Sequence, residues 1–185
     1  PDGSAWYVSL IGDGKVLKFD RANRLVGQVS METPGLLALD PVHDSLYVGR
    51  SMTAVNPPKS LGIIHRTPFT LVEEQEVLIP RPHALVVTRD GKWVHTASLA
   101  ENRIASVETA TGRVTLSSIT GTPRSLVQFT IAPDGHTMLA GGELSNTMLA
   151  WDPSQPPLAL GRETPVGGKP WDQVFRRDGQ VAYVS

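Results

Sequence analysis

The strongest constraint on the fold is a repeat of about 44 residues that runs along the chain. Gly91, Gly135 and Gly179 each follow an aspartate and stand 44 residues apart, and a fourth Asp-Gly pair at Gly3 stands two such periods before Gly91. In the second copy, residues 40–44 (DPVHD) take the place of this pair. Four copies and a fraction of a fifth are visible, which predicts one structural unit used repeatedly.

Each copy contains four short apolar runs separated by turn-forming residues. In the third copy these runs are residues 82–88, 92–97, 103–108 and 114–119. Short runs rich in β-branched and aromatic residues and bounded by Gly, Pro, Asp or Asn are typical of β-strands. Four hairpin-linked strands in about 44 residues match the blade of a β-propeller. We therefore predict an all-β propeller with four-stranded antiparallel blades, of which about four are visible.

One segment also fits a helix. In residues 69–79, Leu71, Val72, Gln75 and Leu78 could share one helical face. The segment stands where the other copies place their fourth strand, and agreement among copies favours a strand here too.

The number of copies bears on the completeness of the ring. Propellers have four to eight blades, and a six- to eight-bladed ring at about 43 residues per blade needs roughly 260 to 345 residues. We therefore expect residues 1–185 to form a single propeller domain that is incomplete at one or both ends. A partner that completes the ring is the second interpretation.

The repeat resembles a known family. Residues 105–114 (ASVETATGRV), residues 129–135 (FTIAPDG) and the two YVS triplets at 7–9 and 183–185 are similar to the YVTN-type repeats of bacterial and archaeal propellers. That resemblance implies a periplasmic or extracellular location. Propellers with such repeats include surface-layer proteins, lactonase-like enzymes and the propeller subunits of amine dehydrogenases and haem-containing nitrite reductases. The second copy departs from the pattern with an insertion at residues 50–60.

Composition removes several classes of function. The chain has no cysteine, which excludes thiolate metal sites, cysteine nucleophiles and disulfides. Its 17 Lys and Arg residues balance 18 Asp and Glu residues with no basic block, so the sequence predicts no nucleic-acid partner. No apolar run is long enough to be a transmembrane segment, so a membrane-associated complex would form through a partner.

Candidate binding residues come from aligning the copies on their Asp-Gly turns. The residues just inside each innermost strand are expected at the mouth of the central channel, where propellers usually gather function. The polar ones are His83, Arg124, Gln128, Trp171 and Asp172, with Arg81 nearby. His83 and Asp172 are the candidates for catalysis, either as metal ligands or as an acid/base pair for attack of water on an ester. The simpler interpretation is that these side chains bond neighbouring blades or water.

The loops of the same face suggest a weaker hypothesis about metals. Asp13, Glu101 and Glu143 come from three copies, and oxygen ligands of this kind suit a divalent cation such as calcium. Nothing in the sequence makes them converge, and no metal-binding motif is present, so solvated loop charges are the preferred interpretation and no cofactor is assigned.

Three functions remain open. The first is a non-catalytic propeller that serves as a protein-interaction or scaffold subunit of a larger extracytoplasmic assembly, because the repeat carries no catalytic motif. The second is a lactonase-like hydrolase with its site at the channel mouth. The third is a propeller subunit that docks to a haem or quinone electron-transfer protein.

Overall fold

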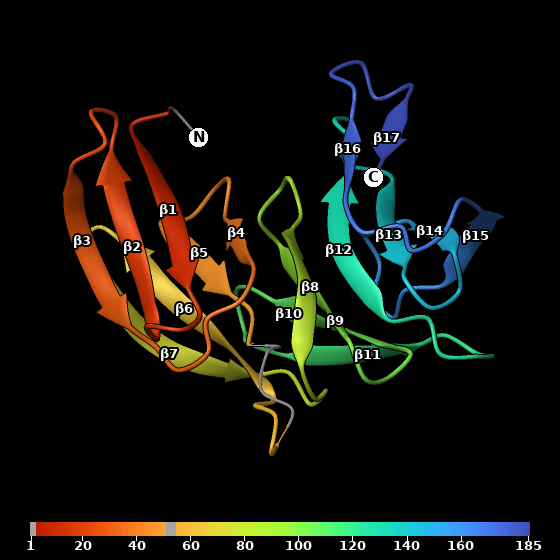
Figure 1. Ribbon diagram of the computed structural model, residues 1–185, viewed down its shortest axis with the longest axis horizontal. Coiled ribbons are helices and arrows are strands. Elements are labelled where there is room, and N and C mark those ends of the chain that lie inside the picture. The colour runs from red at the N-terminus through yellow and green to blue at the C-terminus, as the bar shows by residue number, and fades with distance from the viewer. Residues whose placement is uncertain (1–2, 51–54) are drawn as a thin grey trace.

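The computed structural model describes residues 3–50 and 55–185, and in these residues all regular structure is β-strand. The strands form five consecutive antiparallel sheets, with three, four, four, four and two strands. Figure 1 shows these sheets following one another from the red β1–β3 sheet to the blue β16–β17 hairpin. The prediction of four-stranded antiparallel propeller blades is confirmed. None of the described residues form a helix that could cross a membrane.

The sheets divide the strands as the repeat divides the sequence. The first sheet contains β1 (Ala5–Leu10), β2 (Lys15–Asp20) and β3 (Leu25–Ser30); the second contains β4 (Leu37–Leu39), β5 (Ser45–Val48), β6 (Ser60–Arg66) and β7 (Phe69–Glu76). The third contains β8 (Pro82–Val87), β9 (Trp93–Ser98), β10 (Arg103–Glu108) and β11 (Val114–Ser118). The fourth contains β12 (Leu126–Ile131), β13 (Met138–Gly142), β14 (Thr147–Trp151) and β15 (Leu160–Pro165), and the fifth contains β16 (Gln173–Phe175) and β17 (Ala182–Val184).

The ambiguous segment is a strand. β7 pairs with β6 along its whole length, with one bulge between Ile63 and Ile64. Two innermost strands, β4 and β16, have three residues each, whereas the innermost strands β8 and β12 have six.

Apolar side chains hold neighbouring sheets together through three clusters. The first and second sheets share a cluster that includes Val16 and Ile64, and the second and third share one that includes Tyr47 and Leu85. The third and fourth share the cluster of Ile104, in which Phe129 and Trp151 meet edge to face. Burial of apolar area is the main stabilising term in folding, so these three clusters hold each sheet against the next one.

Glycines at the end of the second strand in the second and fourth copies lie very close to the chain of the next sheet. A Cβ atom on Gly141 would lie 2.6 Å from the carbonyl oxygen of Pro170, and one on Gly49 would lie 3.1 Å from the carbonyl oxygen of Pro82. Pro82 is the first residue of β8, and Pro170 lies three residues before β16, so each belongs to the start of the following sheet. A larger side chain would push two sheets apart.

A buried histidine also joins two sheets. The ring of His95, on β9, is fully buried, with Nδ1 2.9 Å from Ser106 Oγ and Nε2 2.9 Å from the carbonyl oxygen of Pro153 in the fourth sheet. A carbonyl oxygen only accepts, so Nε2 donates to Pro153 and Nδ1 accepts from the Ser106 hydroxyl. Burial lowers the pKa of His95 to about 4, and the ring bridges the sheets in its neutral form.

Candidate functional site

The candidate site lies on the face where the innermost strands begin, which we call the mouth face. It is built from the turns that follow the second strand of each copy and from the connections between sheets. A backbone bond joins turn and connection in all four copies: Met31 N donates to Gly14 O, Val77 N to Lys59 O, Ile119 N to Asn102 O and Val166 N to Asn146 O, at 2.7–3.0 Å. The topology therefore gathers all of these segments on one face.

The connections share a backbone feature that the sequence did not indicate. Thr33, Arg81, Ser125 and Lys169 stand at equivalent places and all have positive φ angles, from 48° to 53°. This conformation is uncommon for residues other than glycine and asparagine, so no turn-forming residue marks it. Residues in such conformations cost of order 1–3 kcal/mol each and are found where the surrounding structure fixes them, often at functional sites.

His83 and Trp171 are brought together from sheets that are not neighbours. His83 is the second residue of β8, and Trp171 lies two residues before β16. Val127, in the fourth sheet, is at the equivalent place between them. Their ring centroids lie 6.3 Å apart in an edge-on arrangement. Trp171 is 54% exposed, whereas His83 is buried. Burial and the nearby charge of Arg81 lower the pKa of His83 to about 4, so its imidazole is neutral at physiological pH.

Gln128 and Asp172 take part in contacts near the junction of the fourth and fifth sheets. The carbonyl oxygen of Gln128 accepts a hydrogen bond from Gln173 Nε2 at 2.8 Å. Among the described residues, the side-chain oxygens of Gln128 and Gln173 are buried without a hydrogen-bond partner. Asp172 is exposed, and its carboxylate accepts from the backbone N–H of Gln173 at 2.8 Å.

Arg124 is occupied by groups of its own chain. Its Nε and Nη2 atoms donate to the two carboxylate oxygens of Glu163, on β15, at 3.1 and 2.9 Å. Its Nη1 atom donates to the carbonyl oxygens of Thr120 and Thr122, each at 2.9 Å. The Arg124 side chain holds the pKa of Glu163 below its ordinary value. These bonds fix the connection between the third and fourth sheets.

Two asparagine amides, in loops that the sequence places on the mouth face, have a structural role that the sequence analysis did not assign. Asn102 Oδ1 accepts from Arg124 N at 2.9 Å, and Asn146 Oδ1 accepts from Lys169 N at 2.8 Å. Each asparagine therefore joins the turn in which it lies to a connection between two sheets. The signal was available, because Asn102 and Asn146 stand 44 residues apart, one period of the repeat.

The structure assembles no metal centre from the loop carboxylates. Within residues 3–50 and 55–185, no three His, Asp or Glu side chains lie close enough together to hold an ion. Asp13, Glu101 and Glu143 therefore do not converge. Glu101 lies 3.6 Å from Arg103, and Glu143 lies 3.8 Å from Lys169.

The predicted insertion at residues 50–60 includes residues 51–54, which lie outside the described residues.

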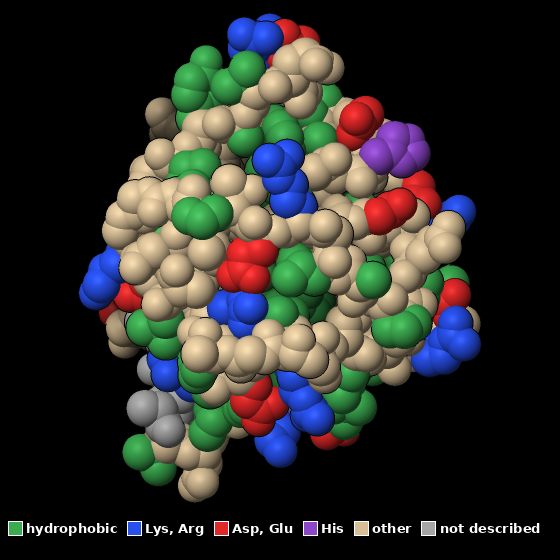
Figure 2. Space-filling view, turned by 90° about the vertical axis from the view of Figure 1, so that its right-hand side faces the viewer, with side chains coloured by type: hydrophobic (Ala, Val, Ile, Leu, Met, Phe, Trp, Pro, Cys, Tyr) green, Lys and Arg blue, Asp and Glu red, His purple; other side chains and the backbone are tan. Residues whose placement is uncertain are grey.

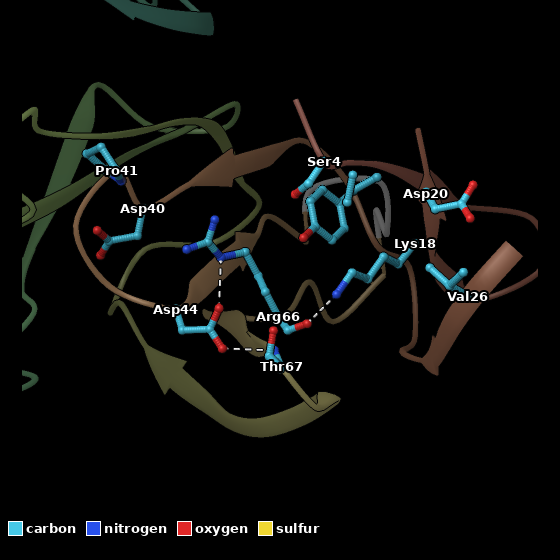
Figure 3. A pocket seen from close by; sticks show the side chains of 11 residues that line it. Ser4, Lys18, Asp20, Val26, Asp40, Pro41, Asp44, Arg66 and Thr67 are labelled. Carbon is cyan, nitrogen blue, oxygen red and sulfur yellow. Dashed lines mark hydrogen bonds and ion pairs between the residues drawn. The ribbon is translucent and has the colours of Figure 1, made fainter. Parts of the chain in front are cut away.

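A pocket of about 500 Å³ opens on the opposite face, between the first and second sheets. Figure 3 shows that Lys18 and Arg66 enter it from different sheets, with Asp44 beside Arg66. Lys18 Nζ donates to the carbonyl oxygen of Arg66 at 2.5 Å, and Asp44 accepts from Thr67 N at 2.8 Å. Within the pocket, Arg66 Nε lies 3.3 Å from Asp44 Oδ1, and none of the predicted site residues line it.

Comparisons with known proteins identify the fold and leave the family open. No protein-family model and no curated protein matches the chain. Hydrazine synthase from Kuenenia stuttgartiensis superposes with a TM-score of 0.80 at 19% identity, over 100% of this chain and 53% of that one. A Bacteroides uniformis protein described as a candidate 6-phosphogluconolactonase superposes with a TM-score of 0.73 at 16% identity, over 92% of this chain and 56% of that one.

Both structures are β-propeller-type folds. Identities this low support the fold alone, and the resemblance to YVTN-type repeats stays a prediction. The chain spans about half the length of each of these two structures.

Proposed function

We propose that this chain is a non-catalytic propeller that acts as a protein-interaction or scaffold subunit of an extracytoplasmic assembly. One observation carries the proposal: the guanidinium of Arg124 at the mouth face is occupied by groups of its own chain, while the indole of Trp171 is left exposed. Arg124 binds Glu163 and two carbonyl oxygens, whereas Trp171 is 54% exposed beside the neutral ring of His83. Exposed aromatic side chains are enriched at protein interfaces.

The surface charge agrees with a protein partner. Figure 2 shows Lys and Arg interspersed with Asp and Glu on the side that it presents, with no broad area of one sign. The formal net charge of −1 likewise gives no excess of positive charge. A surface of this kind offers no electrostatic attraction to nucleic acid.

A lactonase-like hydrolase is the second candidate, since one structural neighbour is described as a candidate 6-phosphogluconolactonase. His83 would be the general base and Asp172 its acidic counterpart. A pKa of about 4 leaves His83 neutral but makes it a weak base at pH 7, because a general base is most effective when its pKa lies near the working pH.

The test is purification of the tagged full-length protein from its natural source, followed by mass measurement in solution and assay on a panel of lactones. We expect a stoichiometric complex with another protein, and no hydrolysis above the buffer rate. A visible spectrum of that complex would show whether the partner carries haem or quinone.

Two variants separate the two candidates. Lactone hydrolysis that is lost in both His83→Ala and Asp172→Asn, with unchanged melting temperatures, would establish the hydrolase and overturn the scaffold. Asp172 is exposed, so the second variant folds even if the buried His83 does not tolerate replacement. A monomer with no bound protein would also contradict the proposal.

A further inference from the structure

We propose that the pocket between the first and second sheets binds a small carboxylate that also carries hydroxyl groups, such as a sugar acid. The pocket opens on the face opposite the mouth face, so the inference goes beyond the proposed function and does not depend on it. Its volume of about 500 Å³ lies within the range of about 300 to 1,000 Å³ that is typical of small-molecule sites. The shape of this junction and the partners of its charged groups define the ligand.

The pocket lies at a junction that is closed by a buried histidine between the third and fourth sheets. There, His95 pairs with Ser106 across β9 and β10, and its ring reaches Pro153 in the turn after the third strand of the next sheet. Two repeat periods earlier, Tyr7 pairs with Lys18 across β1 and β2 in the same way. The hollow that remains between the third and fourth sheets has about 210 Å³, less than half the volume of the pocket between the first two. The first junction therefore has room for a ligand where the other is filled.

Lys18 brings a positive charge to this junction, where the third sheet has the neutral hydroxyl of Ser106. Lys18 is partly buried, and its Nζ atom donates to the carbonyl oxygen of Arg66 at 2.5 Å and lies 5.9 Å from the centre of the Phe69 ring. Within the described part of the chain, no carboxylate lies at ion-pair distance from Lys18. An ammonium has three protons to donate, and burial of a cation is costly unless an anion pairs with it. Lys18 therefore favours an acidic group that comes from a ligand.

Arg66 adds a second donor beside Lys18. Its Nη2 atom donates to the carbonyl oxygen of His43 at 2.8 Å, and its Nε atom lies 3.3 Å from Asp44 Oδ1. Among the described residues, its Nη1 atom has no hydrogen-bond acceptor. A carboxylate that reaches both cations would accept charge-assisted hydrogen bonds, which are about twice as strong as those between neutral groups.

Two of the three carboxylates at the pocket are compensated by their own chain. The Asp40 side chain is fully buried and accepts from two backbone N–H groups at 2.8 Å. The charge of Asp20 is offset by Arg24, whose Nε atom lies 2.7 Å from Asp20 Oδ2. Figure 3 shows Asp40 and Asp20 on opposite sides of the pocket, with Arg66 and Lys18 between them. An anionic group in the middle of the pocket is therefore closest to the two cations.

The third carboxylate, Asp44, accounts for the hydroxyl groups of the ligand. Its side chain is 45% exposed and accepts from Thr67 N at 2.8 Å. An ionised carboxylate has about four acceptor sites and no proton to donate, so its open sites take protons from a ligand. Arg66 lies beside the same carboxylate and repels an ammonium, which favours a neutral hydroxyl donor. A ligand that bonds to Lys18 and Asp44 at once therefore has both an acidic group and a hydroxyl group.

The experiment measures binding to the full-length protein by NMR, through the backbone amide shifts of Arg66 and Thr67. The probes are galacturonate and glucuronate, with galactose and glucose as matched neutral sugars and inorganic phosphate as a second anion. Lys18→Met removes the ammonium and keeps most of the length of the side chain. Lys15→Met is its matched control, because Lys15 lies on the same strand and does not line the pocket.

We expect the uronates to shift both amides and the neutral sugars to bind about tenfold more weakly, because they lack the acidic group. Lys18→Met should weaken uronate binding about tenfold, whereas Lys15→Met leaves it unchanged. The comparison of acid and neutral sugar is made in the wild-type protein, so it tests the inference even if Lys18→Met does not fold.

Equal binding of uronates and neutral sugars, or uronate binding that persists in Lys18→Met, would overturn the inference. Binding of phosphate without binding of either uronate would overturn the assignment of a carboxylate, and no shift with any probe would overturn the site itself. Each of these outcomes leaves the scaffold function standing, because that function is tested through the complex and the mouth face.

Discussion

Acidification should weaken this fold at a mild pH through its two buried imidazoles. His95 and His83 have pKa values near 4 in the folded protein, against an ordinary value of 6.5. As pH falls below 6.5, the unfolded chain takes up protons at these positions while the folded chain does not. Stability is therefore complete above pH 6.5, falls between pH 6.5 and 4, and changes no further below 4 on account of these groups.

The size of the effect follows from the two pKa values. Between pH 8 and pH 5, a histidine with a folded pKa of about 4 lowers the free energy of unfolding by about 2 kcal/mol. His83 contributes a similar amount, so the wild-type protein should lose about 4 kcal/mol over this interval. Asp90, Asp152 and Glu163 also have shifted pKa values, but theirs are lowered, and carboxylates titrate below this interval.

The assay is urea unfolding followed by tryptophan fluorescence at pH 8, 6.5 and 5, at constant ionic strength. His95→Gln should retain about half of the wild-type pH dependence, and His65→Gln, at an exposed position, should retain all of it. Equal losses in wild type and His95→Gln between pH 8 and 5 would refute the reasoning. If His95→Gln does not fold, a ring titration of His95 by NMR in the wild type decides the question, since a midpoint above 6 contradicts it.

Two further predictions concern the packing between sheets. Gly141→Ala should lower the free energy of unfolding in urea by about 1–3 kcal/mol, because its Cβ would meet the carbonyl oxygen of Pro170. Gly167→Ala, whose Cβ would have nothing within 4 Å, should lower it much less. Arg124→Met should lower the free energy of unfolding by about 2 kcal/mol, because it removes the guanidinium that pairs with Glu163, and Arg176→Ala, which breaks a half-exposed pair, should leave it nearly unchanged. A similar cost in each variant and its control would contradict the corresponding argument.

The strands and turns of this fold could be predicted because their determinants are local. The Asp-Gly pairs give φ angles of 70° at Gly91 and 81° at Gly135, as their turns require. The strand at β7 was the preferred interpretation because other copies have a strand at that place. The positive φ angles at Arg81 and Lys169 could not be predicted, because neither residue type favours them and only the surrounding connections impose them.

The candidate site was predictable in part. Aligning the copies placed His83 and Trp171 at equivalent positions, and the structure brings their rings within 6.3 Å. The same alignment proposed Arg124 as a binding residue, and its partner Glu163 stands 39 residues later on the outermost strand of the fourth sheet. No local pattern indicates that pairing, because it depends on how a sheet connection lies across a hairpin.

The sequence by itself determined the architecture, through a 44-residue period of four strands in a chain without cysteine or a large excess of charge. Backbone sterics and apolar periodicity act over a few residues, so they can be read from the sequence. The tertiary structure alone decided that Gly141 faces Pro170, that His95 is neutral beneath Pro153, and that Arg124 is occupied by Glu163. Burial, pKa and partner choice depend on atoms brought together from different sheets, and only packing sets those distances.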